Sequence, residues 1–281
     1  MSIKIITDSS CDLPDELLKK LNIEIVPLKV SFENGETYLE RFELNPVLFA
    51  SKMRSFKTLP KTSTPDPATM ITAFTKGLSE AENVLFICLS SMLSGTCQTA
   101  YTACYSIGSD RIRVFDSKSV SLGTGILAIK AVQMAEQGFT LNEIFENLSI
   151  IRKSSEVIFT LDTLENVVKG GRLKRHEGLL GNLINIKPIM RINEEGLVEI
   201  VERTRGRKKA TKRLLDMIGE YAGESVKNRL IGISHVNCLT EAEDLAAAIK
   251  NRYKPREEII ISEMGSTIGT YAGEGGLAIS L

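Results

Sequence analysis

The sequence predicts an α/β protein of two domains, with a mostly parallel sheet flanked by helices in the first domain and an α+β second domain. Over residues 1–155, short β-branched segments alternate with segments of helical periodicity, the pattern of parallel strands joined by helices. The segment 84–89 is apolar throughout, as expected of a strand buried on both faces. Over 156–281 the alternation is interrupted by a hairpin pattern at 193–196, which favours a mixed or antiparallel sheet.

In the first domain, strands are expected at 3–7, 84–89 and 112–115, with an extended segment at 23–32 and a turn at Asn34-Gly35. Helices are expected over 12–21, 45–55, 66–79, 96–106, 123–137 and 141–152. Asp12 is predicted to cap the first helix, because its carboxylate accepts hydrogen bonds from free N–H groups. The segment 60–67, which begins and ends with proline, is predicted to be a loop.

In the second domain, strands are expected at 157–160, 187–192, 197–203, 229–234, 258–263 and 277–281. Helices are expected over 164–169, over the basic segment 206–221 and over 240–253, with Thr240 as the cap of the last. The glycine-rich segment 265–276 is predicted to be a loop. The last strand could pair in either domain.

Composition narrows the class of protein. The chain of 281 residues carries 35 basic and 35 acidic side chains, so no net charge draws it to nucleic acid. It begins without a signal-peptide pattern and has no apolar window of membrane-spanning length. Five scattered cysteines without a C-x-x-C pair suit a reducing compartment, and two distant histidines predict no metal site. We therefore expect a cytoplasmic protein that does not insert stably into a membrane.

Hydroxyl-rich segments follow three predicted parallel strands, at 8–10, 90–96 and 116–119. Ligands bind beyond the carboxyl ends of such strands, and the helix N-termini that follow favour anions. Helix capping is the simpler explanation for a single serine, but four hydroxyls in 90–96 exceed what a cap requires. A second cluster, Thr62-Ser63-Thr64, is either part of a site or an ordinary turn. The sequence alone does not bring it to Ser94.

Catalytic motifs are missing. The chain has no G-x-G-x-x-G after a strand, no P-loop and no G-x-S-x-G elbow, and no serine has an evident histidine partner. These absences argue against an enzyme with its own catalytic site. A small-molecule kinase or phosphatase subunit on a related fold remains the alternative, because the loops at Asp8 and Ser90 are suited to phosphate.

Several short motifs occur in an order that extends over residues 3–280. They are Thr7-Asp8-Ser9-Ser10, Lys61-Thr62-Ser63-Thr64-Pro65, Ser94-Gly95-Thr96, Asp116-Ser117 with Gly123 and Gly125, Leu161-Asp162-Thr163-Leu164 with Lys169-Gly170-Gly171-Arg172, Lys187-Pro188-Ile189, Arg205-Gly206-Arg207-Lys208-Lys209-Ala210, and Ile268-Gly269-Thr270. In this order the chain resembles the DegV family, the fatty-acid-binding proteins called FakB in the bacterial fatty acid kinase system.

The resemblance implies a bound long-chain fatty acid such as palmitate, with Thr62 and Ser94 on its carboxylate and its acyl chain in an apolar tunnel between the two domains. It also implies a carrier without a catalytic site or cofactor, which presents the carboxylate to a partner, the fatty acid kinase catalytic protein, for acyl phosphate formation. The resemblance also allows a transient contact with a membrane. Further candidates for the pocket are Ser63, Gly95, Thr96, Asp8, Ser117, Thr270 and Tyr271.

The chain departs from the family pattern at Tyr271, where a histidine commonly reaches the carboxylate, and at Thr64, where glutamine is frequent. A phenol donates one hydrogen bond but carries no positive charge near neutral pH. The apolar segment 178–184 is a candidate tunnel wall or ordinary core. Candidates for docking the partner are Arg172, Arg203, Arg205 and Arg207. The basic segment 203–213 is otherwise a solvated face, or the contact surface of a regulatory module.

Overall fold

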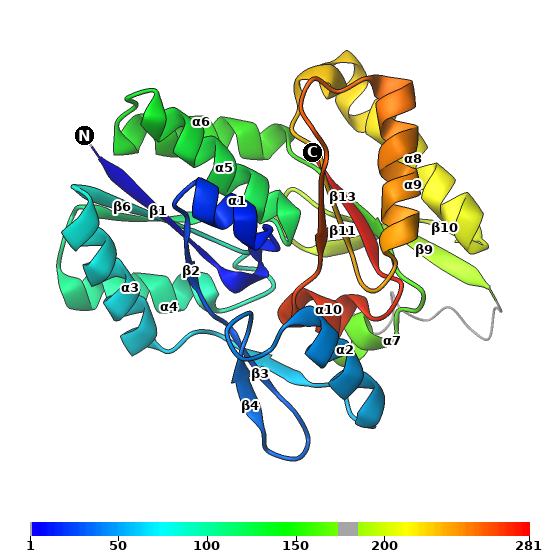
Figure 1. Cartoon of the computed structure of the whole chain (residues 1–281), viewed down its shortest axis with the longest axis horizontal. Coiled ribbons are helices and arrows are strands. Elements are labelled where there is room, and N and C mark those ends of the chain that lie inside the picture. The colour runs from blue at the N-terminus through cyan, green and yellow to red at the C-terminus, as the bar shows by residue number, and fades with distance from the viewer. Residues whose placement is uncertain (1, 174–184) are drawn as a thin grey trace.

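The computed structural model describes residues 2–173 and 185–281, which form an α/β fold with three sheets (Figure 1). The N-terminal sheet has four parallel strands in the order β2 (Glu24–Val26), β1 (Ile3–Asp8), β6 (Asn83–Cys88) and β7 (Ile112–Asp116). The expected parallel sheet in the first half is therefore confirmed. Helices cover both of its faces, as a parallel sheet requires.

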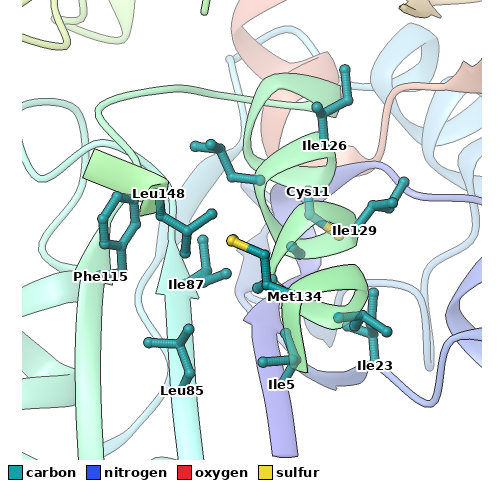
Figure 2. Close-up of a cluster of buried hydrophobic side chains, with 14 of the residues drawn as sticks. Ile5, Cys11, Ile23, Leu85, Ile87, Phe115, Ile126, Ile129, Met134 and Leu148 are labelled. Carbon is teal, nitrogen blue, oxygen red and sulfur yellow. The ribbon is translucent and has the colours of Figure 1, made fainter. Parts of the chain in front are cut away.

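Alternate residues of β1 point to opposite faces of this sheet. Ile5 packs with the helices α1 (Asp15–Lys20), α5 (Leu122–Glu136) and α6 (Leu141–Ser154), whereas Ile6 packs with α3 (Pro67–Glu80) and α4 (Thr96–Ile107). Figure 2 shows Ile129 and Met134 of α5 in one cluster with Ile5 and with Ile87 of β6.

Helix α5 lies between the two halves of the chain. It contacts β1 and β6 on one side and two strands of the second half on the other. Eleven of its 15 residues are buried for this reason, because a helix covered on all sides has no polar face to present. The predicted division into domains at residues 155 and 156 falls in the short segment between α6 and the next strand. That division stays a prediction.

A small antiparallel sheet projects from the first half, in the order β4 (Thr37–Leu39), β3 (Lys29–Ser31) and β5 (Lys61–Ser63). The prediction of a loop over 60–67 is wrong at its centre, because β5 pairs with β3 and sets Thr62 opposite Val30. The helix α2 (Pro46–Ser55) packs on this sheet, and its N-cap Asn45 accepts a hydrogen bond from the N–H of Leu48. The small sheet fixes the position of Thr62.

The C-terminal sheet has six strands in the order β10 (Val198–Arg205), β9 (Ile186–Ile192), β8 (Val157–Thr160), β13 (Leu277–Ser280), β11 (Gly232–His235) and β12 (Ile260–Glu263). Only the β11–β12 pair is parallel, so the predicted mixed sheet is confirmed. The last strand, β13, stays with this sheet and does not return to the first half.

Helices lie on both faces of the C-terminal sheet. One face is covered by α8 (Arg207–Ala222) and α9 (Leu239–Tyr253), and the other meets the short helices α7 (Glu165–Lys169) and α10 (Ser266–Ala272). Two 3-10 turns complete the described elements, η1 (Ser9–Cys11) and η2 (Gly223–Asn228).

Three local predictions are wrong. Asp12 is no helix cap: the first helix begins at Asp15, and the buried Asp12 carboxylate instead accepts hydrogen bonds from Ser121 and Gly265. Thr240 lies inside α9, which starts at Leu239 without a side-chain cap. The segment 265–276 is no simple loop, because it contains α10.

Candidate functional site

A cavity lies between the N-terminal and C-terminal sheets, beside α10 and the small sheet. Its volume is about 170 Å³, and an apolar cavity of roughly 150 Å³ already takes up a benzene-sized group. Most of its lining is apolar: Leu28, Leu89, Leu93, Val120, Val157, Phe159, Leu161, Val167, Ile192, Val198, Met264, Ile268, Ala272 and Ala278. These side chains offer no hydrogen bonds and suit a hydrocarbon.

Several hydroxyl groups line this cavity, and we call the part defined by Thr62, Ser94 and Tyr271 the head-group end. The Thr62 Oγ1 and the Tyr271 hydroxyl lie 2.5 Å apart, and either can donate. Ser94 Oγ lies 2.9 Å from Thr96 Oγ1 and accepts from the Thr96 N–H at 3.3 Å. Two hydroxyl clusters that the sequence could not join therefore line one cavity.

The two clusters lie close together. A methyl group added to Gly95, next to Ser94, would lie 3.5 Å from Thr64 Cγ2, an ordinary van der Waals distance. Ser63, Thr64 and Gly95 line the cavity with Thr62 and Ser94. The loop that follows β6 and the segment 62–64 therefore line neighbouring parts of the cavity.

Arg172 reaches the same end of the cavity. Its guanidinium lies 4.5 Å from the centroid of the Tyr271 ring, and it donates to the carbonyls of Leu93 at 3.3 Å and Gly170 at 2.7 Å. Gly170 is needed for this arrangement, because a methyl group at that position would overlap the Tyr271 ring. The cation therefore stacks on the tyrosine and brings positive charge close to the hydroxyls.

Four of the predicted pocket residues lie behind the lining, fully buried, with their side chains bonded internally. Asp8 accepts from the Leu89 N–H at 2.8 Å and from Ser10. Ser117 Oγ lies 3.0 Å from Thr124 Oγ1, and Thr270 Oγ1 donates to the Ser266 carbonyl at 2.7 Å. Thr96 supports Ser94 and is not among the lining residues. These groups shape the wall and do not face the cavity.

A buried acidic cluster beneath the head-group end was missed from the sequence. It consists of Asp8 and Asp12, which flank η1, and of Glu40, which follows β4. Burial raises the pKa of Asp8 to about 6, against hydrogen bonds from Ser10 and Leu89 that lower it. Burial likewise raises the pKa of Asp12 to about 7, opposed by the bonds from Ser121 and Gly265. No periodicity signals such a cluster, because its members meet only in the fold.

The basic candidates have separate places. Arg207 forms ion pairs with Glu241 at 2.9 Å and with Asp162 at 3.4 Å. Arg203 and Arg205 lie at the end of β10, where their side chains are exposed. The predicted tunnel wall at 178–184 lies outside the described residues. Within residues 2–173 and 185–281, no group of three histidine, cysteine or acidic side chains could hold a metal ion. No helix of that part of the chain has the length and apolarity to cross a membrane.

Known proteins resemble this chain over its whole length. A curated DegV domain-containing protein of Listeria innocua is 34% identical over 279 residues, which are 99% of this chain and 97% of the relative. A solved structure from Thermus thermophilus, described as showing fatty acid binding of a DegV family protein, superimposes with a TM-score of 0.92 at 31% identity and covers 100% of this chain and 99% of the other.

A second structure, described as DegV, a fatty acid binding protein from Bacillus subtilis, has a TM-score of 0.89 at 30% identity, with coverage of 100% and 98%. The family model described as "Uncharacterised protein, DegV family" matches residues 2–281. The chain belongs to the DegV family.

Proposed function

We propose that this protein binds one long-chain fatty acid such as palmitate, with its carboxylate at the head-group end and its acyl chain along the apolar lining. The observation that carries the proposal is the lining of one cavity, in which the hydroxyls of Thr62, Ser94 and Tyr271 stand among mostly apolar side chains. A fatty acid likewise joins one polar head group to a long apolar chain. The similarity to DegV structures described as fatty-acid-binding supports the same ligand.

The energies assign different tasks to the two ends of the ligand. Burying roughly 14 methylenes at about 0.8 kcal/mol each contributes about 11 kcal/mol. Two or three hydrogen bonds to a charged carboxylate contribute roughly 1.5–3 kcal/mol each. Association and ordering costs reduce both figures. The acyl chain therefore provides most of the affinity, and the hydroxyls fix which end of the ligand lies at Thr62 and Ser94.

The hydroxyl pair is suited to receive an anion. In the Thr62–Tyr271 hydrogen bond one hydroxyl donates, and the hydroxyl that accepts keeps its own proton free. That proton can be donated to a carboxylate without breaking the pair. Tyr271 is thus the residue that takes the place of the family's usual histidine, with Arg172 on its ring as the nearby positive charge.

We further propose that the protein is a carrier that presents the carboxylate to a partner kinase for acyl phosphate formation. Neutral hydroxyls hold the head group without neutralising it, so it stays nucleophilic towards a phosphate. Arg205 is exposed and forms no ion pair among the described residues, which leaves it available to an anionic surface of the partner. The alternative, a kinase or phosphatase subunit, has less support because Asp8 and Ser90 are fully buried and internally bonded.

The ligand is tested by mass spectrometry of lipid extracted under denaturing conditions from protein purified from a bacterial host. We expect long-chain fatty acid at close to one molecule per chain, and markedly less in the Thr62→Ala, Ser94→Ala double variant. Wild-type protein that holds no fatty acid and takes up none when it is added would refute the proposal. Unchanged lipid content in the double variant would refute the head-group assignment.

A further inference from the structure

Glu40, directly after β4, is a carboxylate with no solvent exposure. It forms no ion pair among the described residues. Its oxygens instead accept four hydrogen bonds, from Ser9 Oγ at 2.5 Å, Ser266 Oγ at 3.1 Å, the Thr267 N–H at 2.6 Å and Thr267 Oγ1 at 2.8 Å. A set made only of donors fits an ionised carboxylate, which has acceptors alone.

Three of these four bonds come from the first turn of α10, the helix that carries Tyr271. With seven residues, α10 is too short to be stable by itself. Its place depends on contacts with its surroundings. Glu40 binds its first turn, Phe49 of α2 packs closely on Gly269 in its middle, and Thr62 bonds Tyr271 near its end.

The chain comes unusually close to the acidic cluster where α10 begins. A methyl group on Gly265 would lie 2.6 Å from Glu40 Oε1 and 3.2 Å from Asp12 Oδ1. The Gly265 N–H also donates to Asp12 at 2.8 Å. Two carboxylates thus lie against the start of α10. A larger side chain at position 265 would push the start of α10 away from them.

Glu40 and Thr62 belong to the same piece of structure. Glu40 follows β4 and Thr62 lies in β5, the two outer strands of the small sheet. The small sheet therefore contacts α10 at both ends. The hydrogen bonds to Glu40 fix the start of α10 and, with it, the position of Tyr271. Thr267 also lines the cavity, and its hydroxyl is engaged by Glu40.

We propose that Glu40 is a positioning residue for the head-group end: it fixes α10 against the small sheet and so holds the Tyr271 hydroxyl beside Thr62. The inference rests on the proposed fatty-acid site and adds a residue that never touches the ligand. Mere packing would be served by an apolar side chain, whereas a buried, fully bonded carboxylate selects one arrangement of its donors.

The test is a double-mutant cycle on fatty-acid affinity, measured with delipidated protein and palmitate. We expect Glu40→Gln to weaken binding about tenfold in the wild-type background, the effect of misplacing one hydroxyl that bonds a charged group. In the Tyr271→Phe background the same change should weaken binding less than about twofold, because the group it positions is already absent. Equal losses in both backgrounds, or no loss in either, would overturn the inference.

The matched control is Glu43→Gln, the same chemical change on the same segment. Glu43 is exposed and its carboxylate accepts from the Leu39 N–H without contacting α10. It should leave palmitate affinity unchanged, and a loss equal to that of Glu40→Gln would count against the inference. If Glu40→Gln does not fold, Ser266→Ala takes its place in the cycle, because it removes one donor to Glu40 and keeps the carboxylate.

Hydrogen exchange separates this inference from the proposed function. Glu40→Gln should speed exchange of the α10 amides, relative to Glu43→Gln, whatever the ligand is. If the wild-type protein binds no fatty acid, the proposed function is refuted. The exchange rates of the α10 amides then still test whether Glu40 positions the helix. Unchanged exchange in α10 would overturn the positioning role even where fatty acid binds.

Discussion

Replacing Thr62 by valine removes one hydroxyl and keeps the shape of the side chain. Valine suits a strand at least as well as threonine, so the pairing of Thr62 with Val30 in the small sheet should persist. The variant loses a hydrogen bond to a charged carboxylate, which contributes roughly 1.5–3 kcal/mol, and palmitate should therefore bind about 10- to 150-fold more weakly. It also leaves the Tyr271 hydroxyl without its partner in the empty site.

The assay is a competition titration of delipidated protein with a fluorescent fatty acid, at one pH and one salt concentration. Methyl palmitate provides the internal comparison, since it has the acyl chain but no charge. Its affinity for wild-type and Thr62→Val protein should agree within about twofold, because a hydrogen bond to a neutral group contributes less. Thr37→Val, at an exposed position of β4 in the same sheet, controls for loss of a hydroxyl as such.

The result that would refute this reasoning is an equal loss for acid and ester, or palmitate affinity in Thr62→Val as high as in Thr37→Val. Either outcome would mean that the hydroxyl of Thr62 does not meet a carboxylate.

Three other predictions concern the surroundings of the site. Gly170→Ala should weaken palmitate binding about tenfold, comparable to loss of one bond to a charged group, because its methyl group displaces the Tyr271 ring. The φ of −73° at Gly170 suits alanine, so the backbone adds no strain, and the free energy of unfolding in urea should fall by about 1–3 kcal/mol because of the displaced ring alone. Unchanged affinity would contradict the placement of the ring. Asp12→Asn should flatten the pH dependence of the free energy of unfolding between about pH 4 and pH 7. The raised pKa of Asp12, about 7 in the folded protein, makes the folded state bind more protons than the unfolded state in that window, so wild-type stability falls as pH rises through it. Urea unfolding across that range checks this, and parallel curves for the two proteins would contradict it. Arg205→Glu should lower acyl phosphate formation by the partner kinase and leave palmitate affinity unchanged; normal formation would remove Arg205 from the docking surface.

Hydrophobic periodicity was sufficient to predict the parallel sheet and its helices. The position of Ser94 after a buried strand was sufficient to predict a hydroxyl-rich loop there. They failed where structure depends on contacts distant in sequence. Segment 60–67, between two prolines and rich in hydroxyls, has no strand pattern, and β5 forms because β3 is there to pair with it. Helix α10 lies among several glycines and is too short to register as periodic.

The head-group end required both kinds of information. The sequence predicts an anion site at the loop of Ser94, but only the fold brings Thr62 and Tyr271 within 2.5 Å of each other, across 209 residues of sequence. The same holds for the acidic cluster. The sequence predicts Asp12 to be a helix cap, yet its carboxylate accepts a hydrogen bond from Gly265, 253 residues away. Local patterns cannot indicate such pairs, because the energy that buries them comes from tertiary packing.

The most direct test of the proposed site is a crystal structure of the protein with bound palmitate. We expect elongated density between the N-terminal and C-terminal sheets, with the carboxylate within hydrogen-bonding distance of the hydroxyls of Thr62 and Ser94 and with the acyl chain along Phe159 and Ile268. A carboxylate at the other end of the cavity, or palmitate bound elsewhere with this cavity empty, would contradict the account.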